Sequence, residues 1–447
     1  MIVSSAFRGR RYVVLGLARS GMATVEALLA SGAHVTAWDR REGPRDELAG
    51  RATIGDPLAI DLAGFDGIVV TPGVPLNTHP IVARARAAGV PLIGDIELFA
   101  QARATLPPHK VVGITGTNGK STTTALVHHI LKIAGVPTTM GGNIGLPILA
   151  QDPLPEGGVY VLELSSYQLD LTQSLDCDVA VLTNITPDHL DRYADFEAYR
   201  LSKLRLFSMQ TEQHAAIIAD RGASLRHYVF DLMTGPGELS LPPDDDNFGV
   251  DDQASFPTLQ GPHNAQNVWS ASSACGYLGI RREVVEAGLR TYPGLPHRME
   301  RIGEHRGVLF VNDSKATNPT ATAPALAAFP RVHWIVGGLP KGDDLDECAP
   351  HFGHVVAAYT IGEAGPRFAE ALDPHMHVER CEMLCEATRR AIAAARPGEV
   401  VLLSPACASF DQFRDYETRG HVFRKIVAKL TGQADAEPCD FTARSAA

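Results

Sequence analysis

Residues 113–121 have the sequence GITGTNGKS, and this stretch decides which fold we expect. It follows the apolar run 111–114 and precedes a segment of helical composition. A strand, a glycine-rich turn and a helix in this order are typical of a phosphate-binding loop, in which backbone N–H groups and the helix N-terminus hold the anion. Lys120 would then reach the β- and γ-phosphates, and Ser121 would bind Mg²⁺. The strict pattern has glycine where this chain has Ile114, so we interpret the stretch as a variant loop; the alternative is an ordinary strand-to-helix turn.

Apolar strands, turns and helices alternate on both sides of this loop, which predicts an α/β protein of parallel sheets with helices on their faces. Further strands are expected at 12–15, 35–38, 68–70, 159–162, 179–182, 309–311, 332–336, 355–361 and 400–403. Helices are expected at 22–30, 121–134 and 265–278. The Pro-containing stretch 106–109 and the turn 294–296 indicate two boundaries, which divide the chain into domains 1–100, 101–298 and 299–447. Residues 234–262 predict a surface hairpin or loop, and the tail beyond 432 is expected to be frayed.

Composition and charge narrow the class of protein. Of the 447 residues, 45% are hydrophobic and 20% are charged, as in ordinary globular proteins. The formal net charge of -11 argues against a general nucleic-acid binder, although a local loop can still bind phosphate. Seven scattered cysteines suggest reduced thiols, and the sequence has neither a signal-peptide core nor an apolar stretch of ~18 residues. We therefore expect a cytoplasmic protein with no membrane span and no nucleic-acid partner.

A second glycine turn lies near the N-terminus. Residues 16–21 differ by one residue from a dinucleotide-binding fingerprint, and Asp39 ends the next expected strand at the spacing of a ribose contact. Ala18 replaces the glycine that normally lets the backbone approach a pyrophosphate. The turn is therefore weak support for NAD, and both a nucleotide-like ligand and a purely structural turn remain open.

Polar residues follow two strands next to the phosphate loop in sequence. Glu163 ends the expected strand 159–162, and a carboxylate at this place could hold Mg²⁺, although it could also be a capping or surface residue. Residues 184–193, NITPDHLDRY, follow another strand and place Asp188, His189, Asp191 and Arg192 close together. A lone histidine is usually structural, but this position favours a functional role.

Two more polar segments follow strands in the last third of the chain. They are NDSKATN at 312–318 and SPACASFD at 404–411. Both put hydroxyls and charges at the carboxyl ends of strands, where open α/β sheets bind ligands. Cys407 invites a nucleophile hypothesis, but no basic group flanks it in sequence, so we disfavour that role.

Taken in order along the chain, these motifs resemble the Mur ligase family. The segments that carry the resemblance are GITGTNGKST at 113–122, GGNIG at 141–145, ELSSYQL at 163–169, NITPDHLDRY at 184–193, GLPHRME at 294–300, NDSKATN at 312–318 and SPACASFDQF at 404–413. The phosphate loop is shared with folylpolyglutamate synthetase. The last two segments resemble in particular the family members that add D-glutamate.

The resemblance implies three domains: a Rossmann-like N-terminal domain for the UDP portion of the substrate, a P-loop ATPase-like central domain for ATP, and a Rossmann-like C-terminal domain for the amino acid. The implied reaction joins D-glutamate to UDP-N-acetylmuramoyl-L-alanine through an acyl phosphate, with release of ADP and phosphate. The implied cofactors are ATP and two Mg²⁺ ions, and the chain is expected to be a monomer. The alternatives are another carboxylate–amine ligase and a nucleotide-binding regulatory module without catalysis.

The resemblance also assigns residues to roles. The UDP portion would be bound by Arg19, Ser20, Asp39, Arg40 and Gly73, and the muramoyl-alanine portion by Asn143 and His189. ATP would be bound by Gly116, Thr117, Asn118, Gly119, Lys120, Ser121, Thr122, Asn264, Asn267, Arg298, Asp313 and Lys315. D-Glutamate would be positioned by Thr317, Lys341, Ser409 and Tyr416. The catalytic residues would be Lys120, Glu163, His189 and Lys203, and the metal ligands Ser121, Glu163, His189 and Lys203.

Lys203 and Pro340 raise specific expectations. Taken alone, Lys203 resembles a solvated helix lysine, but the family pattern places it beside the metals, where an ammonium has the wrong charge. The resemblance implies that Lys203 carries a carbamate, an anionic oxygen ligand of the kind that Mg²⁺ prefers. Pro340 stands where many relatives have an acidic residue, so that function is either absent or supplied by Asp343 or Asp344. Tyr416 stands where relatives often have phenylalanine.

Overall fold

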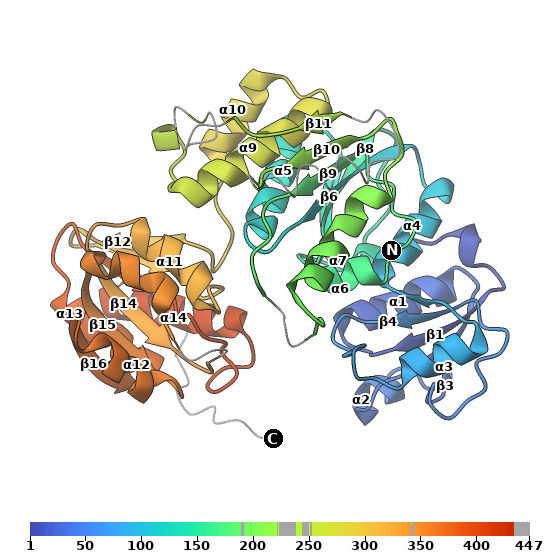
Figure 1. The fold of residues 1–447 in the computed structure, drawn as a ribbon, viewed down its shortest axis with the longest axis horizontal. Helices are drawn as coiled ribbons and strands as arrows, with labels where there is room; N and C mark the ends of the chain where they lie inside the picture. Colours follow the sequence, from blue (N-terminus) through green and yellow to red (C-terminus); the bar gives the residue numbers. More distant parts are fainter. Residues whose placement is uncertain are drawn as a thin grey trace. The chain divides into compact units, whose positions relative to one another are not determined.

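The computed structural model describes residues 1–188, 192–220, 222, 238–243, 250, 253–340 and 344–432. The chain forms two compact units, one of Met1–Asp252 with Asn264–Thr291 and the other of Gln253–His263 with Tyr292–Ala447. Among the described residues there are three sheets, two in the first unit and one in the second (Figure 1).

The first sheet contains only parallel pairs. Its strands are β1 (Arg11–Leu15), β2 (His34–Trp38), β3 (Thr53–Ile54), β4 (Gly67–Val70) and β5 (Leu92–Ile93), in the order β3-β2-β1-β4-β5. Its helices are α1 (Arg19–Ala30), α2 (Glu42–Asp46), α3 (Ile81–Ala88) and α4 (Asp95–Ala102). Because β2 and β4 flank β1 on opposite sides, the carboxyl end of β1 is a switch point, where open α/β sheets bind ligands.

The second sheet carries the phosphate loop and is also parallel. Its strands are β6 (His109–Thr115), β7 (Thr138–Gly142), β8 (Gly158–Glu163), β9 (Val179–Leu182), β10 (Ala215–Ile218) and β11 (Leu239–Ser240), in the order β11-β10-β9-β6-β8-β7. Its helices are α5 (Lys120–Ile133), α6 (Ser166–Asp170), α7 (Phe196–Ser208), α9 (Pro262–Tyr277) and α10 (Arg282–Thr291). Strand β6 therefore lies between β9 and β8, so the loops that follow these three strands meet at one edge of the sheet.

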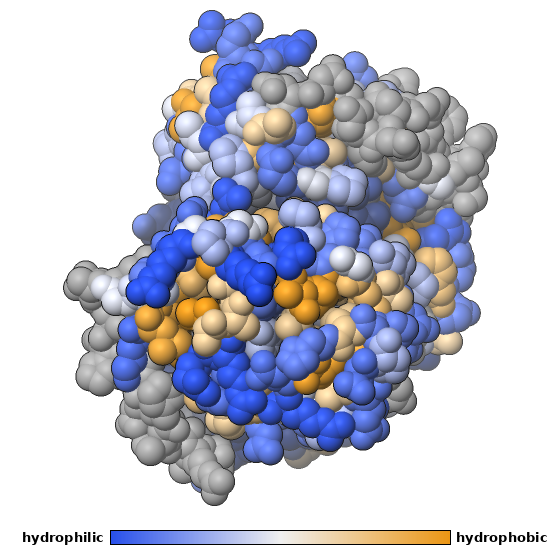
Figure 2. All heavy atoms as spheres, turned by 90° about the vertical axis from the view of Figure 1, so that its left-hand side faces the viewer, coloured by the Kyte–Doolittle hydropathy of each residue, from blue (hydrophilic) through white to orange (hydrophobic). Residues whose placement is uncertain are grey.

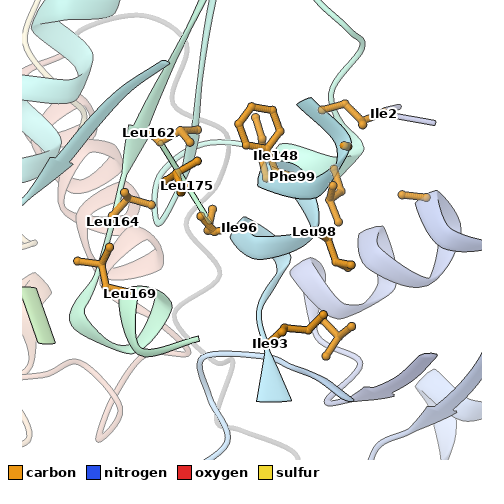
Figure 3. Packing of buried hydrophobic residues seen from close by; sticks show 14 of the residues in the cluster. Ile2, Ile93, Ile96, Leu98, Phe99, Ile148, Leu162, Leu164, Leu169 and Leu175 are labelled. Atoms are coloured by element: carbon orange, nitrogen blue, oxygen red, sulfur yellow. The ribbon is translucent and has the colours of Figure 1, made fainter. Parts of the chain in front are cut away.

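The first two sheets share one apolar core, centred on helix α4. Buried residues of α1 and β1 belong to the same cluster as buried residues of β8, β9 and α7. Figure 3 shows Ile96 and Phe99 of α4 on the side of Leu175 and Ile148. The ring of Phe99 lies 5.0 Å from that of Tyr160 on β8, in an edge-to-face arrangement. This continuous core explains why the two sheets form a single compact unit.

The third sheet forms the second unit. Its strands are β12 (Glu300–His305), β13 (Val308–Asn312), β14 (Val332–Gly337), β15 (Val355–Ile361), β16 (His377–Glu382) and β17 (Val400–Leu403), in the order β12-β13-β17-β14-β15-β16. All pairs are parallel except β12 with β13. Its helices are α11 (Pro319–Ala327), α12 (Gly365–Leu372), α13 (Leu384–Ala394) and α14 (Tyr416–Thr431).

Side chains of the third sheet alternate between two cores of its own. Along β14, Trp334 and Val336 belong to one cluster, whereas Ile335 belongs to the other. This period of two is expected for a strand covered on both faces. Figure 2 displays one face of the molecule, on which apolar residues lie among hydrophilic ones. Exposed large apolar side chains of this unit include Phe410 and Met383.

Short 3₁₀ turns connect several of these elements. They are η1 (Ser5–Phe7), η2 (Arg103–Thr105), η3 (Ile148–Ala150), η4 (Gln253–Ser255) and η5 (Asp346–His354). No helix in the described ranges is both long and apolar enough to cross a membrane.

The predicted α/β fold with three mostly parallel sheets is confirmed, and two local predictions are wrong. Helix α1 begins at Arg19 rather than at residue 22, so Gly21 lies inside the helix. A Cβ at Gly21 would lie 1.9 Å from the Gly16 carbonyl oxygen, so this glycine permits close helix–strand packing. For residues 234–262, predicted as a surface hairpin or loop, the hairpin alternative is wrong, because Leu239–Ser240 joins β10 as a parallel edge strand. Residues 234–237, 244–249 and 251–252 of this stretch lie outside the described residues. The predicted frayed tail lies outside the described residues.

Candidate functional site

The phosphate loop connects β6 to α5 and is tightly enclosed. Gly116 and Gly119 have φ angles of 144° and 82°, which non-glycine residues rarely adopt. A Cβ at Gly116 would lie 2.0 Å from Thr183 Oγ1, and one at Gly119 would lie 2.3 Å from Asn267 Oδ1. Both glycines are therefore required by backbone conformation and by space.

Asn184 braces the loop from the end of β9. The Thr117 N–H donates to the Asn184 carbonyl oxygen at 2.8 Å, and the Asn118 N–H donates to Asn184 Oδ1 at 2.9 Å. Two loop N–H groups are thus already engaged, and the first turn of α5 is the part of the loop best suited to hold an anion. Sequence analysis gave Asn184 no role; its position at the end of the strand adjacent to β6 is the signal that could have revealed one.

Two lysines converge on one carbonyl oxygen of the loop. Lys120 Nζ donates to the carbonyl oxygens of Gly116 and Thr117 at 2.9 and 2.8 Å. Lys203 Nζ, from α7, donates to the same Gly116 oxygen at 2.7 Å. Lys203 is only 2% exposed, and its Nζ lies 4.5 Å from the centre of the Tyr199 ring. Burial, together with the nearby charge of Lys120, holds the pKa of Lys203 well below its ordinary value.

Glu163 forms the second part of the site. It is 2% exposed at the end of β8, and its Oε2 accepts a hydrogen bond of 2.5 Å from Ser121 Oγ. Its Oε1 accepts a bond of 3.1 Å from Asn143 Nδ2, and its carbonyl oxygen accepts one of 2.8 Å from the Asn143 N–H. The alternative of a surface glutamate is therefore wrong. The Ser121 hydroxyl and the Glu163 carboxylate are hard oxygen donors of the kind that Mg²⁺ prefers, so they fit the expected metal.

The remaining predicted metal ligand, His189, lies outside the described residues. In the described part of the chain, no group of three or more His, Cys, Asp or Glu side chains gathers in a way that could hold a metal. Ser121 and Lys203 are not of these four residue types and therefore do not count toward such a group. Of the predicted metal ligands, Ser121 and Glu163 are the two that the structure joins by a hydrogen bond.

Helix α9 contributes two of the predicted ATP residues. Asn267 Oδ1 accepts a hydrogen bond of 3.2 Å from Thr123 Oγ1 of α5, and its Nδ2 donates to Asn264 Oδ1 at 3.0 Å. Both asparagines are buried. The neighbouring Gln266 bonds the Asn184 side chain, so α9 supports the phosphate loop at several points.

The predicted UDP residues of the first sheet lie at the carboxyl ends of β1, β2 and β4. Arg19 and Ser20 begin α1, and the Arg19 guanidinium donates to the Gly145 carbonyl oxygen in the loop after β7. Asp39 Oδ2 accepts a hydrogen bond of 2.7 Å from the Leu17 N–H. Burial raises the pKa of Asp39, but the hydrogen bonds from Arg41 and Leu17 outweigh it and lower that pKa to about 2. Arg40 and Gly73 are exposed near the ends of β2 and β4.

In the second unit, Asp313 directly follows β13 and is deeply buried. Its Oδ2 accepts a hydrogen bond of 2.7 Å from Ser404 Oγ, and its Oδ1 accepts one of 3.1 Å from the Met299 N–H. Burial raises the pKa of Asp313 to about 7 despite these bonds. Lys315 Nζ lies 4.1 Å from the centre of the Tyr416 ring. The structure therefore brings one predicted ATP residue against one predicted D-glutamate residue.

Arg419 of α14 holds the loops of this unit together and was missed by sequence analysis. It is 1% exposed, and its guanidinium donates to Ser314 Oγ and the Ser314 carbonyl oxygen at 3.0 and 2.8 Å. It also donates to the carbonyl oxygens of Cys407 and Ala408 at 3.0 and 3.1 Å. The segments 312–318 and 404–411 are thus tied to one side chain. Burial lowers the pKa of Arg419 to about 10, so it remains charged at neutral pH.

The other predicted residues of this unit are placed as follows. Arg419 holds both segments concerned: Ser409 is buried in 404–411, and Thr317 is partly exposed in 312–318. Arg298 precedes β12. Pro340 follows the glycine pair 337–338, where a Cβ at Gly338 would lie 2.4 Å from the Ala408 carbonyl oxygen. Lys341 lies outside the described residues.

Known proteins match this chain over nearly its whole length. The UDP-N-acetylmuramoylalanine--D-glutamate ligase of Novosphingobium aromaticivorans is 63% identical, over 98% of this chain and 99% of the relative. The enzyme of the same name from Sphingopyxis alaskensis is 60% identical, over 96% and 100%. The chain belongs to the Mur ligase family. The resemblance predicted from the motifs is therefore confirmed.

Separate family descriptions match the three parts of this Mur ligase. A MurD-like N-terminal domain matches residues 10–94, a Mur ligase middle domain residues 114–229, and a Mur ligase glutamate ligase domain residues 297–407. Among solved structures, the MurF ligase of Thermotoga maritima in complex with ADP has a TM-score of 0.59 at 15% identity, over 96% of this chain and 98% of that one. That likeness supports the fold alone.

Proposed function

We propose that this Mur ligase uses ATP to join D-glutamate to UDP-N-acetylmuramoyl-L-alanine, and releases ADP and phosphate. The observation that carries the proposal is the match, over nearly the whole chain, to relatives that bear the name of this activity. The phosphate loop and the buried pair of Ser121 and Glu163 support it independently. We also propose that the enzyme acts in the cytoplasm as a monomer, and that its domains are 1–100, 101–298 and 299–447.

In the first step, a carboxylate oxygen of the UDP substrate attacks the γ-phosphorus of ATP. The new C–O–P linkage forms as the bond between the γ-phosphorus and the bridging oxygen breaks, and ADP leaves. Lys120 moves from its loop carbonyls to the β- and γ-phosphates, and first-turn N–H groups of α5 hold the phosphate oxygens. Mg²⁺ held by Ser121, Glu163, His189 and Lys203 would neutralise the phosphate charge.

In the second step, the amine of D-glutamate attacks the acyl carbon. The C–N bond forms through a tetrahedral intermediate, phosphate leaves and the ammonium proton is lost. We assign D-glutamate to Thr317, Lys341, Ser409 and Tyr416. Arg419 supports this assignment because it holds two of the loops concerned in one arrangement. The function of the acid that many relatives have in place of Pro340 would be either absent or supplied by Asp343 or Asp344.

Lys203 is proposed to carry a carbamate in the active enzyme. Carbamate formation needs a neutral amine, and both burial and the charge of Lys120 favour the neutral form of Lys203. Addition of CO₂ to Nζ forms an N–C bond, releases a proton and gives an anionic oxygen donor beside Glu163. Enzyme equilibrated with ¹³C-bicarbonate should show a carbamate ¹³C resonance that is missing in Lys203→Ala. Acetate should partly restore the activity of that variant; a fully active Lys203→Ala enzyme would contradict the proposal.

Phosphate release measured with UDP-N-acetylmuramoyl-L-alanine and a panel of D- and L-amino acids tests the proposed reaction. Only D-glutamate should support rapid release, and the nucleotide product should be ADP. Release of AMP and pyrophosphate would indicate adenylate chemistry, whereas a preference for another amino acid would assign the chain to a different ligase reaction.

A further inference from the structure

Arg192 lies between β9 and α7 of the second sheet, and it forms a hydrogen bond with the turn that follows β4 of the first sheet. Its guanidinium NH2 donates to the Val74 carbonyl oxygen at 3.0 Å, across 118 positions of sequence. The same guanidinium lies over the Tyr167 ring, with its central carbon 4.4 Å from the ring centre. A guanidinium that stacks on an aromatic ring directs its N–H groups parallel to the ring plane. The contact with the Tyr167 ring therefore fixes the direction of the N–H group that donates to Val74.

The Tyr167 ring that Arg192 contacts is itself part of an aromatic stack. The Tyr167 ring stacks on that of Tyr193, with centres 6.1 Å apart and planes at 15°. The Tyr193 hydroxyl donates to Asp170 Oδ2 at 2.8 Å and also contacts Ser202 Oγ at 3.2 Å. Through these contacts Arg192 is fixed to both α6 and α7, the helix that carries Lys203.

The accepting carbonyl belongs to a turn at the carboxyl end of β4. The Val74 N–H donates to the Thr71 carbonyl oxygen at 3.1 Å and closes the turn, and the Thr71 N–H donates to the Leu15 carbonyl oxygen at 3.1 Å. The turn also contacts the loop after β1, because a Cβ at Gly16 would lie 2.2 Å from Thr71 Oγ1. Arg192 therefore holds the turn that contains Gly73 against the loop that leads to Arg19.

A second hydrogen bond joins the two sheets, with its donor on the first sheet's side. Arg19 of α1 donates to the Gly145 carbonyl oxygen of the second sheet's region, whereas Arg192 of that region donates to a carbonyl oxygen of the first. Each bond joins a predicted UDP loop to a segment near the phosphate loop. Hydrogen bonds with a charged donor are stronger than neutral ones, so the pair can fix both UDP loops at the same time.

We propose that Arg192 is a positioning residue for the UDP portion of the substrate. It acts through the 71–74 turn rather than by contact with the reacting atoms. The inference rests on the proposed function in one respect only, namely that the 71–74 turn forms part of the UDP subsite. Loss of the donor should loosen that subsite and leave the ATP subsite unchanged.

The test compares Arg192→Met with wild type by isothermal titration calorimetry of UDP and of ADP. Methionine keeps an apolar stem over Tyr167 but cannot donate to Val74. The dissociation constant for UDP should rise about tenfold, as expected for the loss of one charged hydrogen bond, and that for ADP should change less than about twofold. Arg282→Met is the matched control, because Arg282 pairs with Glu286 within α10 and its side chain is 88% exposed, and it should leave UDP affinity unchanged.

Steady-state kinetics distinguish a failure of this inference from a failure of the proposed function. In Arg192→Met the KM for UDP-N-acetylmuramoyl-L-alanine should rise about tenfold while kcat stays within about twofold. Unchanged UDP affinity, or equal losses for UDP and ADP, would overturn the inference. A wild-type enzyme that binds UDP but does not turn over would instead overturn the proposed function. If Arg192→Met does not fold, Arg192→Lys serves the same comparison, with a smaller rise for UDP alone.

Discussion

The two compact units differ in how their apolar cores are organised. In the first unit, one continuous cluster extends from α1 through α4 to β8 and α7 and so joins two sheets. In the second unit, a single sheet has a core on each face. The loops predicted to bind UDP and the phosphate loop are therefore parts of one packed body. The residues assigned to D-glutamate belong to a body that is stabilised separately.

Each unit nevertheless uses the same device to fix its loops. Asn184 ties the end of β9 to the phosphate loop, and Arg419 ties the segment after β13 to the segment after β17. In both cases the two strands are neighbours in the sheet. A buried polar side chain that is fully bonded can define the shape of a loop that apolar packing does not reach.

The largest expected effect is the loss of turnover in a variant of the phosphate loop, which belongs to the first unit. Lys120→Ala removes the cation assigned to the β- and γ-phosphates, and turnover should fall roughly a thousandfold or more. Thermal unfolding should change little, because the hydrogen bonds from the Lys120 amine to the Gly116 and Thr117 carbonyl oxygens lie within the phosphate loop and not in an apolar core. The measurement is ADP release, with the melting curve as control. Near-normal turnover would remove the loop from the mechanism.

The shared core can be broken at Phe99. Phe99→Ala leaves a cavity between α4 and β8 and should destabilise the first unit by about 3–5 kcal/mol. Hydrogen exchange in denaturant should show β1 and β8 losing protection together, while β14 keeps its protection. Phe423→Ala, in the core of the second unit, is the matched control and should show the reverse. Loss of protection in β1 alone would mean that the first two sheets do not unfold as one body.

The second unit can be tested through Lys341, which the resemblance assigns to D-glutamate. Lys341→Ala should raise the KM for D-glutamate about ten- to a hundredfold, because a charged partner of a carboxylate is lost. The KM values for ATP and for the UDP substrate should change far less. Equal increases for all three substrates would show that the amino-acid site has been misplaced.

A smaller effect distinguishes the pH dependence of the two units. Burial raises the pKa of Asp95, at the start of α4, to about 6. The folded state therefore binds this proton more tightly than the unfolded state, so the contribution of Asp95 to stability falls as pH rises from about 4 to about 6. Asp95→Asn should flatten this part of the stability profile of the first unit, by about 2 kcal/mol.

Asp313→Asn is the matched control for that measurement. Burial raises the pKa of Asp313 to about 7, so the same sign applies, but in the second unit. Urea unfolding followed by hydrogen exchange between pH 4 and 8 resolves the two units. An Asp95→Asn profile as steep as that of wild type would show that this carboxyl titrates normally.

The sequence predicted the elements whose physical signals are local. The strands at β1, β6, β8 and β17 are continuous apolar runs, as expected for parallel strands with both faces covered. The phosphate loop followed from the order of strand, glycine turn and helix, and Glu163 followed from its place at the end of an apolar strand. The edge strand β16, HVERCE, was missed because polar residues interrupt its apolar pattern.

The parts of the site that sequence analysis missed depend on sheet order. Asn184 braces the phosphate loop only because β9 lies next to β6, and these strands are far apart in the chain. Arg419 has no local sequence signal of its burial, because arginine is rarely buried unless its charge is satisfied. Hydrogen bonds of this kind cannot be inferred from spacing, since spacing does not give strand order.

Trapping the acyl phosphate with hydroxylamine tests most directly whether Lys120 of the first unit serves the phosphoryl step and Lys341 of the second unit serves only amide formation. Wild-type enzyme with ATP and UDP-N-acetylmuramoyl-L-alanine, but without D-glutamate, should form the substrate hydroxamate and ADP. Lys341→Ala should still form hydroxamate while its product formation at low D-glutamate is lost, and Lys120→Ala should form neither. Hydroxamate formation by Lys120→Ala, or its loss in Lys341→Ala, would contradict this division of the reaction between the two units.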